Sequence, residues 1–216
     1  MRKENCVEFA LEFLKKKFDE SEYFADKKAE KDYRFEHSVR VANIGRIIAE
    51  KEGMDSDALV IACLLHDISY CNEFAGREDA MNHGRYSAKI ARPFLEEIGM
   101  EPEVIEDICY GIAIHVDDKA DFPGERTFFA LSVGDADNID RFDAYRIYEN
   151  LKWVKYDEMS LAEKKEHCER LVAKLEKFKS LDFATETSRA MWLEKLDFQI
   201  EFYNKLLKQA ENSVLN

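Results

Sequence analysis

Apolar residues recur at intervals of three and four positions along most of this chain, which is the spacing of amphipathic α-helices. In the clearest case His37, Val41, Ile44 and Ile48 fall on one face of a segment from about 33 to 52. Convincing runs of alternating apolar and polar residues, which would indicate strands, are absent. The pattern therefore predicts an all-α protein.

The first part of the chain divides into three predicted helices. We expect them at about 3–18, 33–52 and 56–66, with a charged connection at 19–32. Gly53 is a natural stop for the second helix, because glycine readily adopts the left-handed backbone of a helix C-terminus. Asp55 or Ser56 can cap the third helix, which places Leu59, Cys63 and His66 on one face.

The middle of the chain predicts three more helices. A loop is expected at 69–82, after which His83 and Gly84 introduce a helix that ends at Gly99. Pro93 lies inside this helix and should kink or divide it. Further helices are expected at about 102–115, with Pro102 in its first turn, and at about 128–147, after an acidic loop at 117–124.

The last part of the chain, from about 155 to 216, differs in composition. It predicts two long amphipathic helices at roughly 160–179 and 184–211, with solvated Glu/Lys faces and an aromatic set that includes Trp192 and Phe202. That aromatic set suits the core and also leaves a homodimer contact open. We predict one domain over residues 1–216, with its motif region at about 30–150 and the C-terminal hairpin packed on the same globule.

Composition bounds the class of protein. The 216 residues are 46% hydrophobic and 36% charged, which is typical of a soluble globular chain, and the low counts of eight glycines and three prolines favour long helices. The net charge of −13 disfavours nonspecific binding to nucleic acid or to an anionic membrane. Small phosphorylated substrates stay compatible with that charge, since bound metal ions supply positive charge locally.

The cysteines and the N-terminus indicate a compartment. Five scattered cysteines without a CxxC pair indicate a reduced cytoplasmic protein. The first residues, from Met1 to Asn5, lead into an amphipathic segment and do not form a signal peptide. No run approaches the ~18 apolar residues of a membrane span. We therefore expect a cytoplasmic protein with no membrane partner.

The candidate chemistry centres on His66 and Asp67, which follow the apolar helical run from Ala58 to Leu65. Adjacent imidazole and carboxylate groups suit divalent Zn, Mn, Fe, Ni or Co. Four of the five histidines stand near apolar helical segments, and these four are His37, His66, His83 and His115. The fifth, His167, lies in a charged run and is expected to be a solvated helix residue.

The ordered pattern of His37, His66-Asp67 and Asp137, with 28 residues between the first two histidines, resembles the HD-domain superfamily of metal-dependent phosphohydrolases. The resemblance covers roughly residues 30–150 and implies an HD-type helical bundle. It also implies that His37, His66, Asp67 and Asp137 bind a divalent metal ion that activates water for phosphate ester hydrolysis. The implied substrate is a small phosphorylated metabolite such as a nucleotide.

In that superfamily, histidines between the His-Asp pair and the last aspartate support a second metal ion or bind substrate phosphate beside a single ion. His83 and His115 fit either arrangement, and with Asp67 they are the predicted catalytic residues. Asp137 is the first choice for the last ligand because Ala136-Asp137-Asn138-Ile139 best matches the expected segment. Asp135 and Asp140 are its competitors, with Asp135 as the alternate, and one of the two could instead orient a ligating histidine.

Four arginines are candidate phosphate contacts, since a guanidinium group matches phosphate bidentately: Arg40, Arg77, Arg85 and Arg141. Two other functions are compatible with the same ligands, a di-iron HD-type oxygenase and a non-catalytic HD domain that binds a nucleotide as a regulator. The chain has no Gly-Tyr-Pro signature after the His-Asp pair, which argues against the cyclic-dinucleotide phosphodiesterases. Hydrolysis is the preferred prediction, with one or two metal ions.

Overall fold

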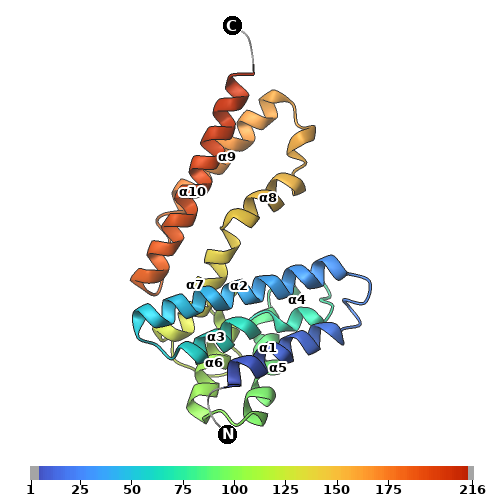
Figure 1. The fold of residues 1–216 in the computed structure, drawn as a ribbon, viewed down its shortest axis with the longest axis vertical. Helices are drawn as coiled ribbons and strands as arrows, with labels where there is room; N and C mark the ends of the chain where they lie inside the picture. Colours follow the sequence, from blue (N-terminus) through green and yellow to red (C-terminus); the bar gives the residue numbers. More distant parts are fainter. Residues whose placement is uncertain (1–4, 214–216) are drawn as a thin grey trace. The chain divides into compact units, whose positions relative to one another are not determined.

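The computed structural model describes residues 5–213, and every regular element among these residues is a helix (Figure 1). The predicted all-α class is therefore confirmed. The chain forms two compact units, the first ending at Asp140 and the second beginning at Arg141. That division comes earlier than the expected start of the C-terminal extension near residue 155, and the single domain over 1–216 stays a prediction. Within residues 5–213, none of the helices combines the length and the apolarity that a bilayer span requires.

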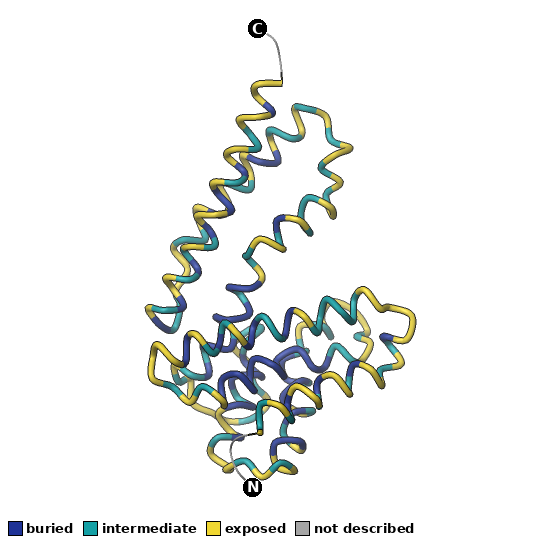
Figure 2. The backbone as a smooth tube through the Cα atoms, in the orientation of Figure 1, coloured by how far each residue is buried: buried dark blue, intermediate teal, exposed yellow. Residues whose placement is uncertain are grey.

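The first unit is built around α3 (Ser56–Leu65), in which every residue from Ala58 to Leu65 is buried (Figure 2). This helix packs most extensively against α1 (Cys6–Asp19), α2 (Lys28–Glu52) and α6 (Pro102–Ile114). Because helices surround it, α3 is apolar on all its faces and not only along one stripe. Asp55 caps it as predicted, since its Oδ1 accepts the N–H of Ala58 at 3.1 Å.

One N-terminal boundary differs from the prediction, and another lies outside the described residues. Within the described residues α1 begins at Cys6, and the expected start at Lys3 lies outside them. The second helix, α2, begins at Lys28 and not at 33, so part of the expected connection at 19–32 is helical. Ion pairs support the added turn, one from Lys28 to Asp32 and one of 2.8 Å from Lys31 to Asp19. Apolar periodicity does not register a turn made of charged residues.

The expected loop at 69–82 also contains helix, namely the 3₁₀ turn η2 (Ile68–Cys71) and the short α4 (Arg77–Ala80). The next helix, α5 (His83–Glu97), begins at His83 as predicted, and Gly99 follows its end with a φ of 74°. Pro93 does not divide α5. Proline has no N–H, so the carbonyl of Lys89, four residues earlier, lacks its helical hydrogen bond. Lys89 is exposed, and water can donate to that carbonyl instead.

The helix expected at 128–147 is two helices. Phe128 begins α7 (Phe128–Arg141) with 67% of its surface exposed. After Arg141 the chain breaks, and α8 (Ala144–Trp153) begins with the Asp143 carboxylate accepting the N–H of Ala144 at 2.6 Å. A capping aspartate starts a new helix because it satisfies a backbone donor that the preceding helix would otherwise have used.

The second unit contains α8, the 3₁₀ turn η3 (Tyr156–Glu158), α9 (Leu161–Phe178) and α10 (Glu186–Glu211). The last two helices pack on each other close to the predicted boundaries. Ser160 and Glu163 form a capping box at the start of α9, and Thr185 caps α10. Trp192 is buried, and its indole N–H donates to the carbonyl of Phe178 at 2.9 Å.

Candidate metal centre

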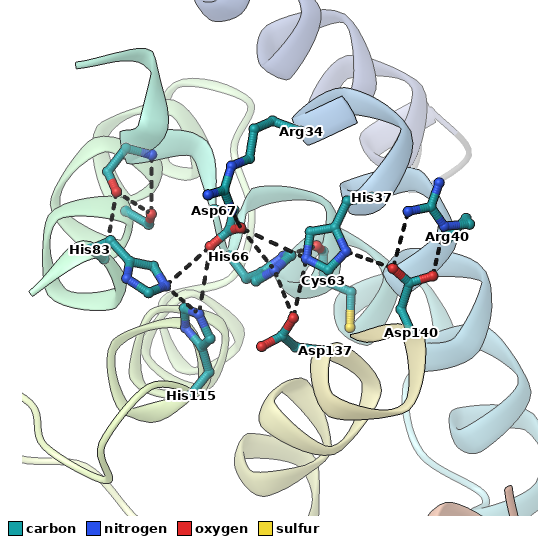
Figure 3. A network of polar contacts seen from close by, with 12 residues as sticks. Arg34, His37, Arg40, Cys63, His66, Asp67, His83, His115, Asp137 and Asp140 are labelled. Carbon is teal, nitrogen blue, oxygen red and sulfur yellow. Dashed lines mark hydrogen bonds and ion pairs between the residues drawn. The ribbon is translucent and has the colours of Figure 1, made fainter. Parts of the chain in front are cut away.

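The four predicted histidine ligands are carried by four different helices of the first unit. His37 lies on the buried face of α2, while His66 and His115 directly follow the last residues of α3 and α6. His83 is the first residue of α5. Three of the four therefore stand at helix ends, where the backbone turns away and a side chain can reach the space between helices. Figure 3 shows their rings pointing toward one another.

Asp67 lies between these rings and presents one oxygen to each side. Its Oδ2 is 3.7 Å from Nε2 of His37 and 3.6 Å from Nε2 of His66. Its Oδ1 is 3.2 Å from Nε2 of His83 and 3.7 Å from Nε2 of His115. Asp137 adds a carboxylate whose Oδ1 is 3.1 Å from Nε2 of His37 and 3.8 Å from Nε2 of His66. We call these six residues the histidine–aspartate cluster.

Each ring uses its other nitrogen, Nδ1, to make a short hydrogen bond outside the cluster. For His66, His83 and His115 the partner is the carbonyl three residues earlier, at 2.7, 2.6 and 2.7 Å. A carbonyl can only accept, so Nδ1 carries a proton, and the lone pair that a metal ion would need can lie only on Nε2. The backbone therefore fixes the tautomer that a metal ligand needs, with Nε2 facing inward.

For His37 a side chain, that of Asp140, takes the place of the backbone carbonyl. Its Oδ2 lies 2.7 Å from Nδ1 of His37, and Arg40 donates to the same carboxylate from Nε at 2.7 Å and from Nη2 at 3.2 Å. On a helix, residues three apart share a face, so Asp137 and Asp140 both face His37. Asp135 is also buried, but it belongs to none of the three ligand groupings within the cluster.

Burial and neighbouring charges shift the pKa values of the cluster residues in different directions. Burial lowers the pKa of His66 to about 4, so this ring is neutral. Burial also lowers the pKa of His37, but Asp137 and Asp140 outweigh it and raise the pKa to about 9. For Asp67, burial is outweighed by His66, His115, His83 and Arg34, which hold the pKa of its carboxyl well below the usual range. Asp67 is therefore ionised.

The chemistry of the cluster fits a divalent transition metal ion. Three combinations of its atoms lie within 4.8 Å of one another, and each contains histidine nitrogen and carboxylate oxygen. Nε2 of His66 is buried and has no hydrogen-bond partner, which is costly for a neutral polar atom unless a ligand takes the lone pair. Nε2 of His83 and Nε2 of His115 are 3.1 Å apart, so either a ring proton shared in a hydrogen bond or a bound cation has to lie between their lone pairs.

The four predicted arginines take different positions. Arg40 binds Asp140, and Arg77 is exposed on α4. Arg85 is buried and donates to oxygens of residues that precede His83 in the chain and of residues that follow His115. Arg141 is exposed at the end of α7 and falls in the second unit. The structure thus brings Arg40 and Arg85 next to the ligating histidines as supporting groups, not as arginines facing the space between the rings.

One arginine beside the cluster was not predicted. Nη1 of Arg34 lies 3.1 Å from Oδ2 of Asp67, and its guanidinium carbon is 3.4 Å from the centre of the Tyr70 ring. Arg34 precedes His37 by three residues and therefore shares its helical face. That spacing was the signal available in the sequence.

His167 also differs from its prediction. It is buried in the second unit and not solvated, with Nδ1 3.3 Å from Nη2 of Arg170. Its neighbours Tyr156 and Tyr203 cover it, which the charged run around it did not reveal.

Comparison with known proteins supports the resemblance. The sequence profile of the HD domain matches residues 34–145. No curated protein matches the chain. A crystal structure described as a predicted HD superfamily hydrolase, from an uncultured Thermotogales bacterium, superposes with a TM-score of 0.64 at 21% identity, over 95% of this chain and 92% of that one. At that identity the likeness shows a common fold. Because the profile covers more than half of the 216 residues and spans the histidine–aspartate cluster, the chain belongs to the HD domain family.

Proposed function

We propose that this protein is a metal-dependent phosphohydrolase that acts on a small phosphorylated metabolite, such as a nucleotide or a related phosphate ester. The observation that carries the proposal is the convergence of four imidazole nitrogens on the two oxygens of the buried Asp67. Histidine and carboxylate ligands of this kind are typical of hydrolytic metal sites.

The residues divide into two ligand sets that share Asp67. His37, His66, Asp67 and Asp137 would hold the first ion, and Oδ1 of Asp67 with His83 and His115 would hold a second. A bound divalent ion of Mn, Zn, Ni, Co or Fe lowers the pKa of a coordinated water and polarises a phosphoryl oxygen. Asp67 can serve both sets because its two oxygens face opposite groups of rings.

His83 and His115 have a second use if a single ion is bound. Burial lowers the pKa of His83, but Asp67 outweighs it and the net pKa is raised. A protonated His83 could then donate its Nε2–H to a phosphate oxygen or to the leaving group. The His83 side chain is 14% exposed and that of His115 only 1%, so His83 is the more accessible of the pair.

Arg34 supplies the positive charge for substrate phosphate. Its side chain is 23% exposed, next to Asp67, and its Nε is buried without a hydrogen-bond partner. Stacking on Tyr70 holds the guanidinium plane, so an oxyanion beside Asp67 would meet a preoriented donor group. In a chain with a net charge of −13 such a fixed cation favours a phosphorylated substrate.

The proposal is tested by phosphate release. The protein is reconstituted with each of the five metals and assayed on a panel of nucleoside mono- and triphosphates and simple sugar phosphates. We expect turnover of at least one substrate, loss of that activity in His66→Ala and Asp67→Asn, and its retention in His167→Gln, which alters the histidine outside the cluster. Full activity in His66→Ala, or no release from any substrate, would refute the proposal.

The two alternatives give different results in the same preparation. A di-iron oxygenase would consume oxygen when substrate is added and would release no phosphate. A regulatory domain would bind a nucleotide, detected by a thermal shift, and would leave it unchanged. The position of Arg34 favours hydrolysis, since its guanidinium group lies beside the histidine–aspartate cluster, where an ester phosphate would bind.

A further inference from the structure

The pair formed by His83 and His115 depends on two helix ends being held together. His83 begins α5 and His115 follows α6, and these helices pack along their lengths. Gly84 allows the approach. A Cβ at this position would lie 2.8 Å from the carbonyl oxygen of Ile112 and 3.0 Å from Nδ1 of His115. Close approach alone does not fix the orientation of the two helix ends. Without a further connection between them, the rings of His83 and His115 would move independently.

Arg85 joins the two ends. On the α5 side it donates from Nε to Oδ1 of Asn82 at 3.1 Å and from Nη2 to the carbonyl of Met81 at 3.3 Å. On the α6 side Nη1 donates to Oδ1 of Asp117 at 2.7 Å and to the carbonyl of Lys119 at 3.1 Å. The partners therefore directly precede His83 and closely follow His115.

The guanidinium group is suited to this position in two ways. Its donors form a planar fork that can bind two segments in one fixed geometry, which the single ammonium of a lysine cannot do. The Arg85 side chain is only 10% exposed, so its bonds are shielded from competing water. All three of its nitrogens are used within the protein, which argues against a role in binding substrate directly.

We propose that Arg85 is a positioning residue that holds His83 and His115 as the ligand pair of a second divalent ion shared with Asp67. The inference rests on the proposed function only in assigning a catalytic role to that second ion. The positioning itself rests on the hydrogen bonds of Arg85 within the protein, beside which Nε2 of His83 and Nε2 of His115 lie 3.1 Å apart.

The first test needs no metal. Histidine ring nitrogens are observed by NMR in ¹⁵N-histidine-labelled, metal-free protein, where five histidines give a simple spectrum. In the wild type, His83 and His115 should each show a proton fixed on Nδ1. In Arg85→Met these two signals should broaden or shift toward a mixture of tautomers, while His37 and His66 keep theirs.

The matched control is Arg92→Met. Arg92 also joins α5 to α6, through Glu106 at 2.5 and 2.8 Å, but it lies nine residues beyond His83, or about 13 Å along the helix. It should leave all the ring signals unchanged. Arg85→Lys should resemble Arg85→Met, because it keeps the charge and loses the fork. If Arg85→Met does not fold, Asp117→Asn weakens one half of the same connection and should give a smaller change at the same two rings.

The second test titrates Zn²⁺ or Mn²⁺ into each variant and counts the ions bound. Loss of a residue that orients a ligand typically costs 10- to 100-fold in affinity, so the second ion should bind at least tenfold more weakly in Arg85→Met and the first within twofold of wild type. Unchanged ring signals, or an equal loss of both ions, would overturn the proposal. If the protein is not a phosphohydrolase, no phosphate is released, but the ring signals and the number of bound ions still follow the prediction. The two proposals can therefore fail independently.

Discussion

Asp140 offers the sharpest prediction about the ligand cluster, because it contacts a ligand and is not itself one. In Asp140→Asn the carboxylate that binds Nδ1 of His37 at 2.7 Å and Arg40 at 2.7 and 3.2 Å becomes a neutral amide. An amide has one acceptor oxygen and one donor nitrogen. Its single oxygen can still accept from Nδ1 of His37 and Nη2 of Arg40, but the bond that Oδ1 accepts from Nε of Arg40 is lost, and so is the negative charge beside His37.

The expected cost follows from two independent magnitudes. A hydrogen bond to a charged group contributes about 1.5–3 kcal/mol, and Asp140 is buried, so water does not replace it freely. Loss of the partner that orients a metal-ligating histidine costs about 10- to 100-fold in metal affinity, which equals about 1.4–2.7 kcal/mol. The first magnitude predicts a loss of folding stability, and the second predicts a 10- to 100-fold rise in the dissociation constant of the first ion.

The assay is a chelator-buffered metal titration near pH 9. Asp137 and Asp140 raise the pKa of His37 to about 9, so at pH 7 a proton on this ring competes with the ion, and raising the pH reduces that competition. Asp121→Asn is the control. It removes the same charge from an exposed ion pair with Lys89 and should not change the affinity. A dissociation constant for Asp140→Asn within twofold of wild type would show that the contact does not orient His37.

Three further predictions concern other parts of the chain. Arg34→Met should lower kcat/KM for a phosphorylated substrate by about 10-fold or more and keep the metal content, with partial rescue by Arg34→Lys; equal kinetics in all three proteins would exclude a role in phosphate binding. Burial lowers the pKa of His167, so the unfolded state binds the proton more readily; stability is then fully present above about pH 6.5 and declines as the pH falls below it. His167→Gln should flatten that decline in urea unfolding followed by tryptophan fluorescence, which reports the second unit because it holds both tryptophans, and parallel profiles would count against it. Gly45→Ala should destabilise the protein by about 1–3 kcal/mol, measured by urea denaturation, because a Cβ would lie 2.7 Å from Sγ of Cys63; an unchanged midpoint would contradict the close packing of α2 on α3.

The helices could be predicted from the sequence wherever burial produced a periodic pattern or a cap marked an end. Gly53, Asp55 and Gly99 mark ends as expected. The prediction was wrong at Lys28, where charged residues continue a helix, and at Asp143, where a cap starts a new helix inside an otherwise helical pattern. In both places a local polar interaction decides the outcome, and apolar spacing carries no information about it.

The ligand cluster could be predicted in outline, because spacing tells which side chains share a helical face. It does not tell which groups meet between helices. Arg85 was predicted as a phosphate contact, and in the folded chain it donates to Asp117 and to the carbonyl of Met81. Arg34, which lies beside Asp67, was not predicted. Asp140 was recognised as a neighbour of the last ligand, but its bond to His37 spans 103 positions and follows only from the packing of α7 near α2.

The most direct test of the central claim is the metal content of protein purified without added metal, measured by elemental analysis beside His66→Ala. His66 is the test position because its buried Nε2 has no hydrogen-bond partner in the protein. We predict one or two equivalents of a divalent transition metal in the wild type and a loss of at least one equivalent in the variant. If the wild type holds no such metal, and binds none of Mn, Zn, Ni, Co or Fe on reconstitution, the histidine–aspartate cluster is not a metal centre.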